Sequence, residues 1–232
     1  MTSEAAAPRG GRTPRPPGDV VAVAHRAGNT VAGLLAAFAA GVDLVELDVH
    51  RYRGALEVRH HKAIGPRHLW DHGSLVRRAD FPIVTLGEIL AAAGRDPRLM
   101  LDLKGVPRRL APDVAALLRE RAPDVALTVC SRHWWMMRDF APPVRCVLSA
   151  GSRTGVARLR RRLAASNAAP DGVAVRLDLL TPDLVRELRG RDRFVLTWPV
   201  DTEADLDRAR WAGVDGVISK NPRLLGEIVA AR

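Results

Sequence analysis

Residues 42–61 read VDLVELDVHRYRGALEVRHH, and this stretch decides which fold the chain adopts. Its first part, VDLVELDV, is an almost continuous apolar run of the kind found in parallel strands that are covered on both faces. The second part carries Arg53-Gly54 between two extended stretches, which predicts a tight turn. We therefore expect a strand that runs on into a β-hairpin instead of into a helix.

Similar apolar runs lie on both sides of residues 42–49. They are 19–24, 98–103, 125–130, 143–148, 171–176, 193–198 and 214–218. The stretches between the runs have helical patterns, at 30–40, 85–93, 111–121, 133–139, 152–165, 181–189, 201–212 and 221–231. Thr30 is placed to cap the first of these helices, and Thr85 with Glu88 has the spacing of a capping box.

Strands that alternate with helices in this way favour one architecture. Eight of each predict an α/β fold, a (β/α)8 TIM barrel with a β-hairpin after the second strand. A doubly wound open sheet is the competing arrangement. No GxGxxG motif follows the first strand, and this weakens the open-sheet alternative.

The length and composition suit a single large domain. The chain has 232 residues and a formal net charge of +10. Residues 1–18 are rich in Pro, Gly and Arg, which predicts a disordered tail before a barrel domain at 19–232. The positive charge fits a solvated basic surface or attraction of phosphate-bearing substrates. Because no basic stripe is interleaved with aromatic residues, nucleic acid is not an expected partner.

The cysteines and the apolar runs bear on location. Cys130 and Cys146 both lie in apolar stretches, and two cysteines make no disulfide framework, so we expect free thiols in a reducing compartment. No apolar stretch has the length of a membrane span. The sequence therefore predicts a cytoplasmic protein without stable membrane insertion, and it leaves the oligomeric state open.

Three carboxylates stand in or beside the apolar strands. Glu46 and Asp48 are two residues apart on one predicted strand, so their side chains share a face and repel unless a cation lies between them. Asp102, on the next strand, could supply a third oxygen ligand. Such a set suits one divalent cation, Mg²⁺ or Ca²⁺. The alternative is a structural ion pair with Arg26 or Lys104.

Two histidines come from different elements and are expected to meet at the barrel mouth. His25 follows the first strand, and counting back from Gly54 places His60 opposite Asp48. A slip of one residue in register would bring His61 there instead. Two imidazoles beside a phosphorus atom could act as general base and general acid, with Arg26 and Lys104 as partners of the phosphate oxygens.

His50 and residues 62–83 each have two alternative interpretations. His50 shares the face of Glu46 and Asp48; it could be an extra ligand, but a solvated residue at the strand end is favoured. The basic stretch 62–83 contains Trp70. It could cover the mouth and select the substrate, or it could be a packed connector anchored by Trp70.

The order of these motifs resembles the glycerophosphodiester phosphodiesterase family across residues 19–232. The matching stretches are His25-Arg26, Asn29-Thr30, Ala37-Phe38, GVDLVELDV (41–49), EVRHH (57–61), LDLKG (101–105), TVCSRHW (128–134), TWPVD (197–201) and GVDGVISKNP (213–222). The resemblance implies a metal-dependent barrel of lipid metabolism that hydrolyses glycerophosphodiesters to glycerol 3-phosphate and an alcohol.

The resemblance also implies residue roles. Glu46, Asp48 and Asp102 would hold the cation, and His25 and His60 would serve as acid and base. Arg26 and Lys104 would bind the phosphate of a small-molecule phosphodiester. A neighbouring hydroxyl of the substrate would attack phosphorus, as is thought for the family.

The sequence departs from the family pattern at several motifs. Ala27 follows His25-Arg26 in place of Gly, Gly28 stands where the family has Glu, and Asp102 replaces a Glu. No Asp follows His60, and Ser219-Lys220 replaces a Thr-Asp pair. Two alternatives therefore stay open. One is phospholipase D-like action on lysophospholipids, and the other is a catalytically inactive barrel that binds a phosphorylated ligand or a protein.

Overall fold

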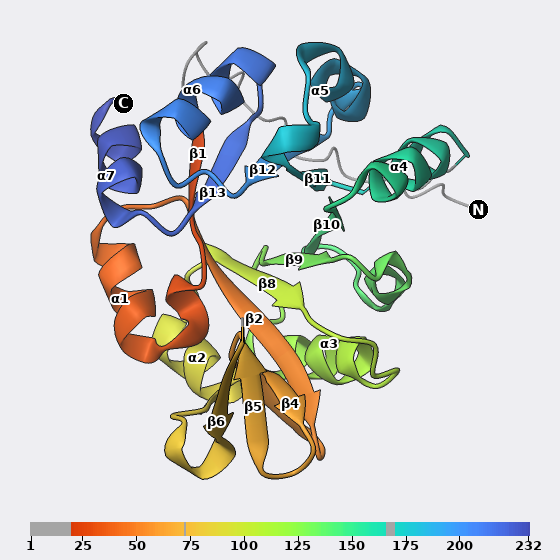
Figure 1. Cartoon of the computed structure of the whole chain (residues 1–232). Helices are drawn as coiled ribbons and strands as arrows, with labels where there is room; N and C mark the ends of the chain where they lie inside the picture. The colour runs from red at the N-terminus through yellow and green to blue at the C-terminus, as the bar shows by residue number, and fades with distance from the viewer. Residues whose placement is uncertain (1–19, 72, 166–169) are drawn as a thin grey trace, which may run out of the picture.

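Eight parallel strands close into a barrel in the computed structural model of the chain, which describes residues 20–71, 73–165 and 170–232 (Figure 1). They are β1 (Val21–Ala24), β2 (Leu44–Tyr52), β8 (Leu99–Leu103), β9 (Thr128–Ser131), β10 (Arg145–Ala150), β11 (Gly172–Arg176), β12 (Phe194–Trp198) and β13 (Gly216–Ser219). Because β1 pairs with both β13 and β2, the sheet has no open edge here. The predicted TIM barrel is confirmed, and the open sheet is wrong. The predicted tail at 1–18 lies outside the described residues.

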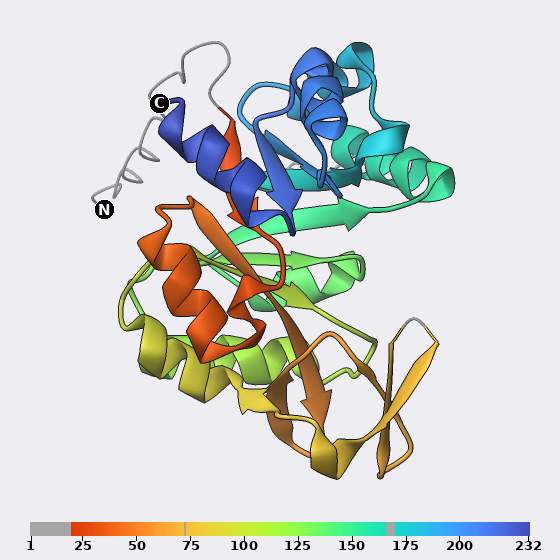
Figure 2. The same cartoon turned by 60° about the vertical axis from the view of Figure 1, so that its left-hand side comes forward.

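The helices lie around the outside of the barrel (Figures 1 and 2). They are α1 (Val31–Ala39), α2 (Leu86–Ala93), α3 (Leu110–Arg121), α4 (Arg153–Ala165), α5 (Pro182–Arg189), α6 (Glu203–Ala212) and α7 (Pro222–Ala230). The cap at Thr30 and the capping box of Thr85 and Glu88 are both present. The helix expected at 133–139 is instead a 3₁₀ helix at Trp134–Asp139, which buries Trp134, Met136 and Met137.

The predicted hairpin is confirmed, with a different register. β2 pairs with the antiparallel strand β3 (Ala55–Val58), and Tyr52 lies opposite Ala55. Arg53 and Gly54 both have positive φ, as a two-residue type I′ turn requires. The centre of the hairpin therefore lies between these residues and not at Gly54. The expectation that His60 lies opposite Asp48 is wrong: the Arg59 backbone N–H donates to the Asp48 carbonyl at 3.0 Å.

A small antiparallel sheet follows the hairpin and projects from one end of the barrel (Figures 1 and 2). Its strands are β4 (Lys62–Ile64), β5 (His68–Asp71) and β6 (Ser74–Arg77), and the chain returns to the barrel through β7 (Val84–Thr85), which pairs with β3. Within β5, the side chain of Leu69 is fully buried, whereas that of Trp70 is 39% exposed. Trp70 is therefore not the anchor of the segment, and Leu69 is.

One side chain from each barrel strand fills the barrel interior. These residues are Val23, Leu44, Met100, Cys130, Val147, Ala174, Leu196 and Ile218. A larger cluster packs between the outer face of the strands and the helices. Because side chains alternate along a strand, residues two positions beyond the interior set again point inward, at the carboxyl ends of the strands. This end of the barrel is where α/β barrels place their functional residues.

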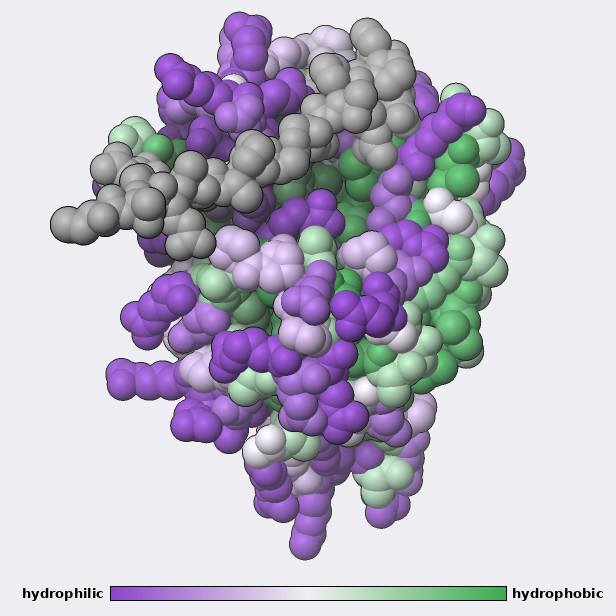
Figure 3. Space-filling model, turned by 180° about the vertical axis from the view of Figure 1, so that it is seen from behind, coloured by the Kyte–Doolittle hydropathy of each residue, from purple (hydrophilic) through white to green (hydrophobic). Residues whose placement is uncertain are grey.

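The described surface is mainly hydrophilic. Seen from behind, charged side chains project over much of the face, and hydrophobic residues gather on the side that α1 and α2 occupy (Figure 3). No helix in the described ranges is both long and apolar enough to cross a membrane. Cys130 and Cys146 are both free thiols, as expected.

Gly216 tests how tightly the barrel wall is packed. A Cβ atom at this position would lie 2.6 Å from the Cβ of Val21 and 2.7 Å from Cδ2 of Leu196. We expect Gly216→Ala to lower the free energy of unfolding by about 1–3 kcal/mol through overpacking, as measured by urea denaturation.

Gly226→Ala is the matched control. Gly226 lies within α7, and a Cβ there would have no neighbour within 4 Å. This variant should gain roughly 0.5–1 kcal/mol from helix propensity. Equal changes in the two variants would contradict the close packing of β13 against β1 and β12.

Candidate active site

The mouth of the barrel is lined by the residues two positions beyond the interior set. These are His25, Glu46, Asp102, Arg132, Ser149, Arg176, Trp198 and Lys220. Carboxylates come from β2 and β8, while cations come from the ends of β9, β11 and β13. Because β9 adjoins β8, the cations flank the carboxylates, and the mouth carries groups of both signs that can orient a charged ligand.

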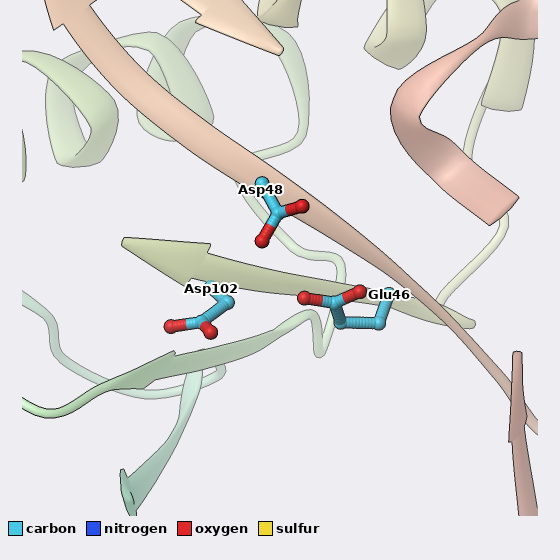
Figure 4. A group of neighbouring side chains, drawn as sticks. All are labelled: Glu46, Asp48 and Asp102. Atoms are coloured by element: carbon cyan, nitrogen blue, oxygen red, sulfur yellow. The ribbon is translucent and has the colours of Figure 1, made fainter. Parts of the chain in front are cut away.

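The three carboxylates predicted from the sequence meet at this mouth. Glu46, Asp48 and Asp102 each offer an oxygen atom, and these atoms lie within 4.8 Å of one another. Figure 4 shows the side chains of β2 and β8 converging. The cause is the parallel register, which sets Asp48 directly beside Asp102. Such a group of oxygen atoms could hold a metal ion.

Lys104 neutralises part of this negative charge. Its ammonium lies 2.8 Å from Oδ1 of Asp48 and is also hydrogen-bonded to Asp102. Burial opposes the charged form of the lysine, but the carboxylates Asp102, Asp48 and Glu46 outweigh it and raise its pKa. The structural ion pair that the sequence offered as an alternative to a metal site is thus present, although it satisfies only part of the cluster.

The pKa values of the three carboxylates divide accordingly. Burial, and then the charge of Asp48, raises the pKa of Glu46 well above its ordinary value. Burial also raises the pKa of Asp102, against the effect of Lys104. Burial acts in the same direction on Asp48, but Lys104 and the Asn29 amide outweigh it and hold the pKa of Asp48 below its usual range. Glu46 is the carboxylate that most lacks a cation.

Two backbone segments fix the orientation of the cluster. Asn29 exchanges two hydrogen bonds with Asp48: its amide nitrogen donates to Oδ2 at 2.9 Å, and its Oδ1 accepts from the Asp48 backbone at 2.8 Å. Arg26 adopts a left-handed conformation, with φ of 59°, and its backbone N–H donates to Oε2 of Glu46 at 2.6 Å. A non-glycine residue in this region is strained, and such strain concentrates at functional sites.

His25 lies beside the carboxylates. Its Nε2 atom is 4.0 Å from Oε2 of Glu46. Burial, followed by the charge of Arg26, lowers the pKa of His25 from 6.5 to about 4. The imidazole is therefore neutral near pH 7 and can accept a proton.

His60 is held between two charged side chains. Its Nε2 atom lies 2.5 Å from Nη2 of Arg26, and its Nδ1 atom lies 2.7 Å from Oδ2 of Asp71 on β5. A guanidinium can only donate, so Nε2 accepts and Nδ1 carries the proton of the neutral ring. Burial lowers the pKa of His60, although the hydrogen bond to Asp71 acts in the opposite direction.

Of the two histidines that competed in the sequence, the structure brings His60 into contact with Arg26. His61 instead packs on Phe81, with ring centroids 4.4 Å apart. The hairpin register alone would not bring His60 to Arg26. The pairing of β2 with β3 ends at Val58, and beyond it the chain no longer follows the alternation of the strand.

We expected His50 to be a solvated residue at a strand end, and the structure differs. Its side chain is half-buried, and burial, followed by the charge of Arg59, lowers its pKa to about 3. Among the described residues, the group of possible metal ligands at the mouth does not include it.

A buried ion cluster ties the small sheet to the hairpin. Glu57 accepts hydrogen bonds from Arg59, at 2.8 Å, and from Arg78. The Arg78 guanidinium also stacks over the Tyr52 ring, 3.9 Å from its centroid. These contacts hold the segment that carries Asp71 in place, although it comes from outside the barrel.

Three residues of the site, Asn29, Asp71 and Arg132, were not predicted from the sequence. Asn29 was noted only as part of a motif. Asp71 carries no local signal, because it meets His60 through the fold of the inserted sheet. Arg132 follows the interior residue Cys130 by two positions, so strand periodicity could have placed it at the mouth.

Glu46→Gln tests the electrostatics of the cluster. The raised pKa of Glu46 in the folded protein adds to the free energy of unfolding, fully so at pH values below the ordinary pKa of 4.5. This contribution is lost as the pH rises from there through the folded-state pKa. In the presence of chelator, the free energy of unfolding of the unmodified protein should therefore fall relative to the variant as the pH rises above about 5. Each pH unit between the two pKa values corresponds to about 1.4 kcal/mol.

Glu88→Gln is the control for this measurement. The capping box lowers the pKa of Glu88, so that Glu88 is ionised in both states across this range of pH. Its difference from the unmodified protein should stay constant. A constant difference for Glu46→Gln as well would show that Glu46 bears no uncompensated charge.

Comparisons with known proteins concern the whole described fold. No protein-family model matches the chain, and a search of curated proteins finds no significant match. Among solved structures, a glycerophosphodiester phosphodiesterase from Thermotoga maritima superposes with a TM-score of 0.72 and 19% identity, over 90% of this chain and 98% of that chain. A provisionally named glycerophosphoryl diester phosphodiesterase from Silicibacter pomeroyi DSS-3 gives 0.72 and 22%, over 92% and 94%.

A third structure contains a small molecule. It is an Oleispira antarctica phosphodiesterase in complex with the product sn-glycerol-3-phosphate, with a TM-score of 0.68 and 18% identity, over 90% of this chain and 96% of that chain. At these identities the comparison bears on architecture. The chain shares the barrel fold of glycerophosphodiester phosphodiesterases.

Proposed function

We propose that the chain is a divergent member of the glycerophosphodiester phosphodiesterase family and hydrolyses glycerophosphodiesters to glycerol 3-phosphate and an alcohol. The observation that carries the proposal is the meeting of Glu46, Asp48 and Asp102 with two histidines at the barrel mouth. The fold shared with those phosphodiesterases supports it.

The carboxylate cluster fits one divalent cation. All three of its ligands are oxygen atoms, which suits Mg²⁺ or Ca²⁺ better than zinc. Three carboxylates against the Lys104 ammonium and the Arg26 guanidinium leave one formal negative charge. Burial and the charge of Asp48 raise the pKa of Glu46 well above its ordinary value. When bound, the cation would neutralise charge on the phosphoryl oxygens.

Arg26 and Lys104 are the proposed phosphate partners. Both cations are already placed against the cluster, with Nε of Arg26 3.8 Å and Nζ of Lys104 2.8 Å from Asp48. A phosphodiester that approaches Asp48 therefore meets a guanidinium and an ammonium. These groups bind phosphate oxygens through charge-assisted hydrogen bonds.

The two histidines would transfer the protons. One ring would take the proton of the attacking hydroxyl of the substrate, and the other would protonate the leaving oxygen. His25, which is neutral near pH 7, suits the base. His60 suits the acid, because Asp71 would stabilise its imidazolium form.

A lysophospholipid substrate is the second candidate. Ile64 and Leu75 are 53% and 58% exposed on the small sheet, on the same face as Trp70. Asp71, the next residue in β5, lies on the opposite face and contacts His60. The apolar face is thus turned away from the histidine, and this favours the water-soluble diester.

The proposed setting is a cytoplasmic one, with a small-molecule phosphodiester as the partner. The two free thiols of the described chain are compatible with a reducing compartment.

His60→Ala and His61→Ala separate the two adjacent histidines. We expect His60→Ala, like His25→Ala, to lower kcat on glycerophosphodiesters by about 10²–10⁴-fold, since each removes a proton-transfer group. His61→Ala should keep kcat within about threefold of the unmodified protein, because His61 contacts Phe81 and not the cluster. Hydrolysis is measured on a panel of glycerophosphodiesters and lysophospholipids, with Mg²⁺, Ca²⁺ or chelator.

The panel also decides between the candidate functions. Cleavage of lysophospholipids alone would favour the second candidate. The absence of turnover on every substrate, from folded protein with either cation, would favour an inactive barrel that binds a phosphorylated ligand or a protein.

Cation binding is tested without activity. Mg²⁺ or Ca²⁺ should stabilise the protein against urea, by about 2.7 kcal/mol at a concentration 100 times the dissociation constant. Asp102→Asn should lose most of this gain. Asp113→Asn, which removes a carboxylate of α3 that pairs with Arg51, should keep it. If the cation stabilises both variants equally, the assignment of the cation to the carboxylate cluster is wrong.

A further inference from the structure

Arg132 occupies a position at the mouth beside Lys104. Asp102 and Cys130 are partners in the register of β8 and β9, so Lys104 and Arg132, each two residues later, lie at the same level. Neighbouring strands are about 4.8 Å apart. Since Cys130 points into the barrel interior, the alternation along the strand directs Arg132 inward as well.

The other cations at the mouth each have a carboxylate partner. Lys104 lies 2.8 Å from Asp48, Arg26 lies 3.8 Å from Asp48, Arg176 lies 2.6 Å from Asp178, and Lys220 lies 3.6 Å from Asp201. For Arg132, no carboxylate lies within ion-pairing distance in the described ranges of the chain. Its charge does act on Asp102, whose ionised form it favours. Arg132 is therefore a mouth cation whose N–H groups have no acidic acceptor.

Trp198 holds this guanidinium in place. The guanidinium carbon of Arg132 lies 5.0 Å from the centroid of the indole ring, which itself packs on the barrel interior. Gly151 makes the stack possible, because a Cβ atom there would lie 3.0 Å from Cη2 of Trp198 and 3.2 Å from Nη2 of Arg132. A stacked guanidinium is restrained in position, yet its N–H donors remain available at its edge.

This geometry selects among ligands. A planar guanidinium binds phosphate or carboxylate through two parallel hydrogen bonds. It also covers the face of Trp198 and repels cations, so a quaternary ammonium group is disfavoured there. We propose that Arg132, stacked on Trp198, forms a subsite for a second anionic group of the substrate, carried by the alcohol that leaves. The preferred substrates are then glycerophosphodiesters whose alcohol bears a phosphate or carboxylate, and this inference rests on the proposed function.

The test compares three glycerophosphodiesters that differ in the leaving alcohol. These are the diesters of choline, of glycerol and of glycerol 3-phosphate, which present a cation, a neutral group and a second phosphate. The unmodified protein should show the highest kcat/KM on the third. Arg132→Gln should lower kcat/KM on that substrate by about 10- to 100-fold, the loss expected for hydrogen bonds to a charged group, and by less than about twofold on the glycerol diester.

Arg158→Gln is the matched control. Arg158 lies on the outer helix α4 and stacks over Trp134 at 5.1 Å, so this variant removes the same charge and a similar stack at a residue that does not line the mouth. It should leave kcat/KM unchanged on all three diesters. A loss equal to that of Arg132→Gln would mean that net charge, and not the subsite, attracts the substrate.

Two results would overturn the subsite while the proposed function stands. One is an equal loss on all three diesters in Arg132→Gln, which would place Arg132 on the shared phosphodiester. The other is no loss on any diester. If the unmodified protein cleaves none of them, the proposed function fails. Calorimetric titration with the uncleaved glycerol and glycerol 3-phosphate diesters then tests the subsite alone: tighter binding of the latter, lost in Arg132→Gln, supports it, and equal affinity contradicts it.

Discussion

The ion pairing of Lys104 with Asp48 and Asp102 is the interaction on which the site depends. Closure of the barrel sets β2 beside β8 and brings their carboxylates together. Buried carboxylates at this spacing repel one another, and removing one partner of a buried pair typically costs about 3–5 kcal/mol. The Lys104 ammonium and the Arg26 guanidinium, which lies 3.8 Å from Asp48, do not neutralise three ionised carboxylates. This imbalance, together with the burial that raises the pKa of Glu46, is the physical basis for proposing a cation at this mouth.

The cations at the mouth flank the carboxylates. Glu46, Asp48 and Asp102 lie on β2 and β8, Arg132 follows the neighbouring strand β9, and Arg176 and Lys220 lie at the ends of β11 and β13. Arg176 and Lys220 are matched by acidic neighbours, so Arg132 is the one of these three cations without a carboxylate partner in the described chain. A phosphodiester at the carboxylates would place its reacting phosphate near Lys104, with its alcohol toward Trp198.

The small sheet supplies a carboxylate that the residues next to His60 lack. His60 is followed by His61 and Lys62, without an adjacent carboxylate. Asp71 contacts the ring instead, from a strand eleven residues further along. The sheet can hold Asp71 there because Glu57 binds Arg78 beneath it and Leu69 is buried. The carboxylate partner of His60 is thus supplied by tertiary structure.

Sequence by itself determined what depends on the period of a single element. Apolar runs gave the eight strands, Arg53-Gly54 gave the hairpin, and the two-residue period placed Glu46 and Asp48 on one face. The tertiary structure decided what depends on distance between elements. It set Arg59 opposite Asp48, brought His60 rather than His61 to Arg26, and stacked Arg132 on Trp198. The first of these follows from the type of the Arg53-Gly54 turn, which sets the register of the hairpin. The other two follow from barrel closure, which joins residues far apart in the chain and so leaves no trace in any local pattern.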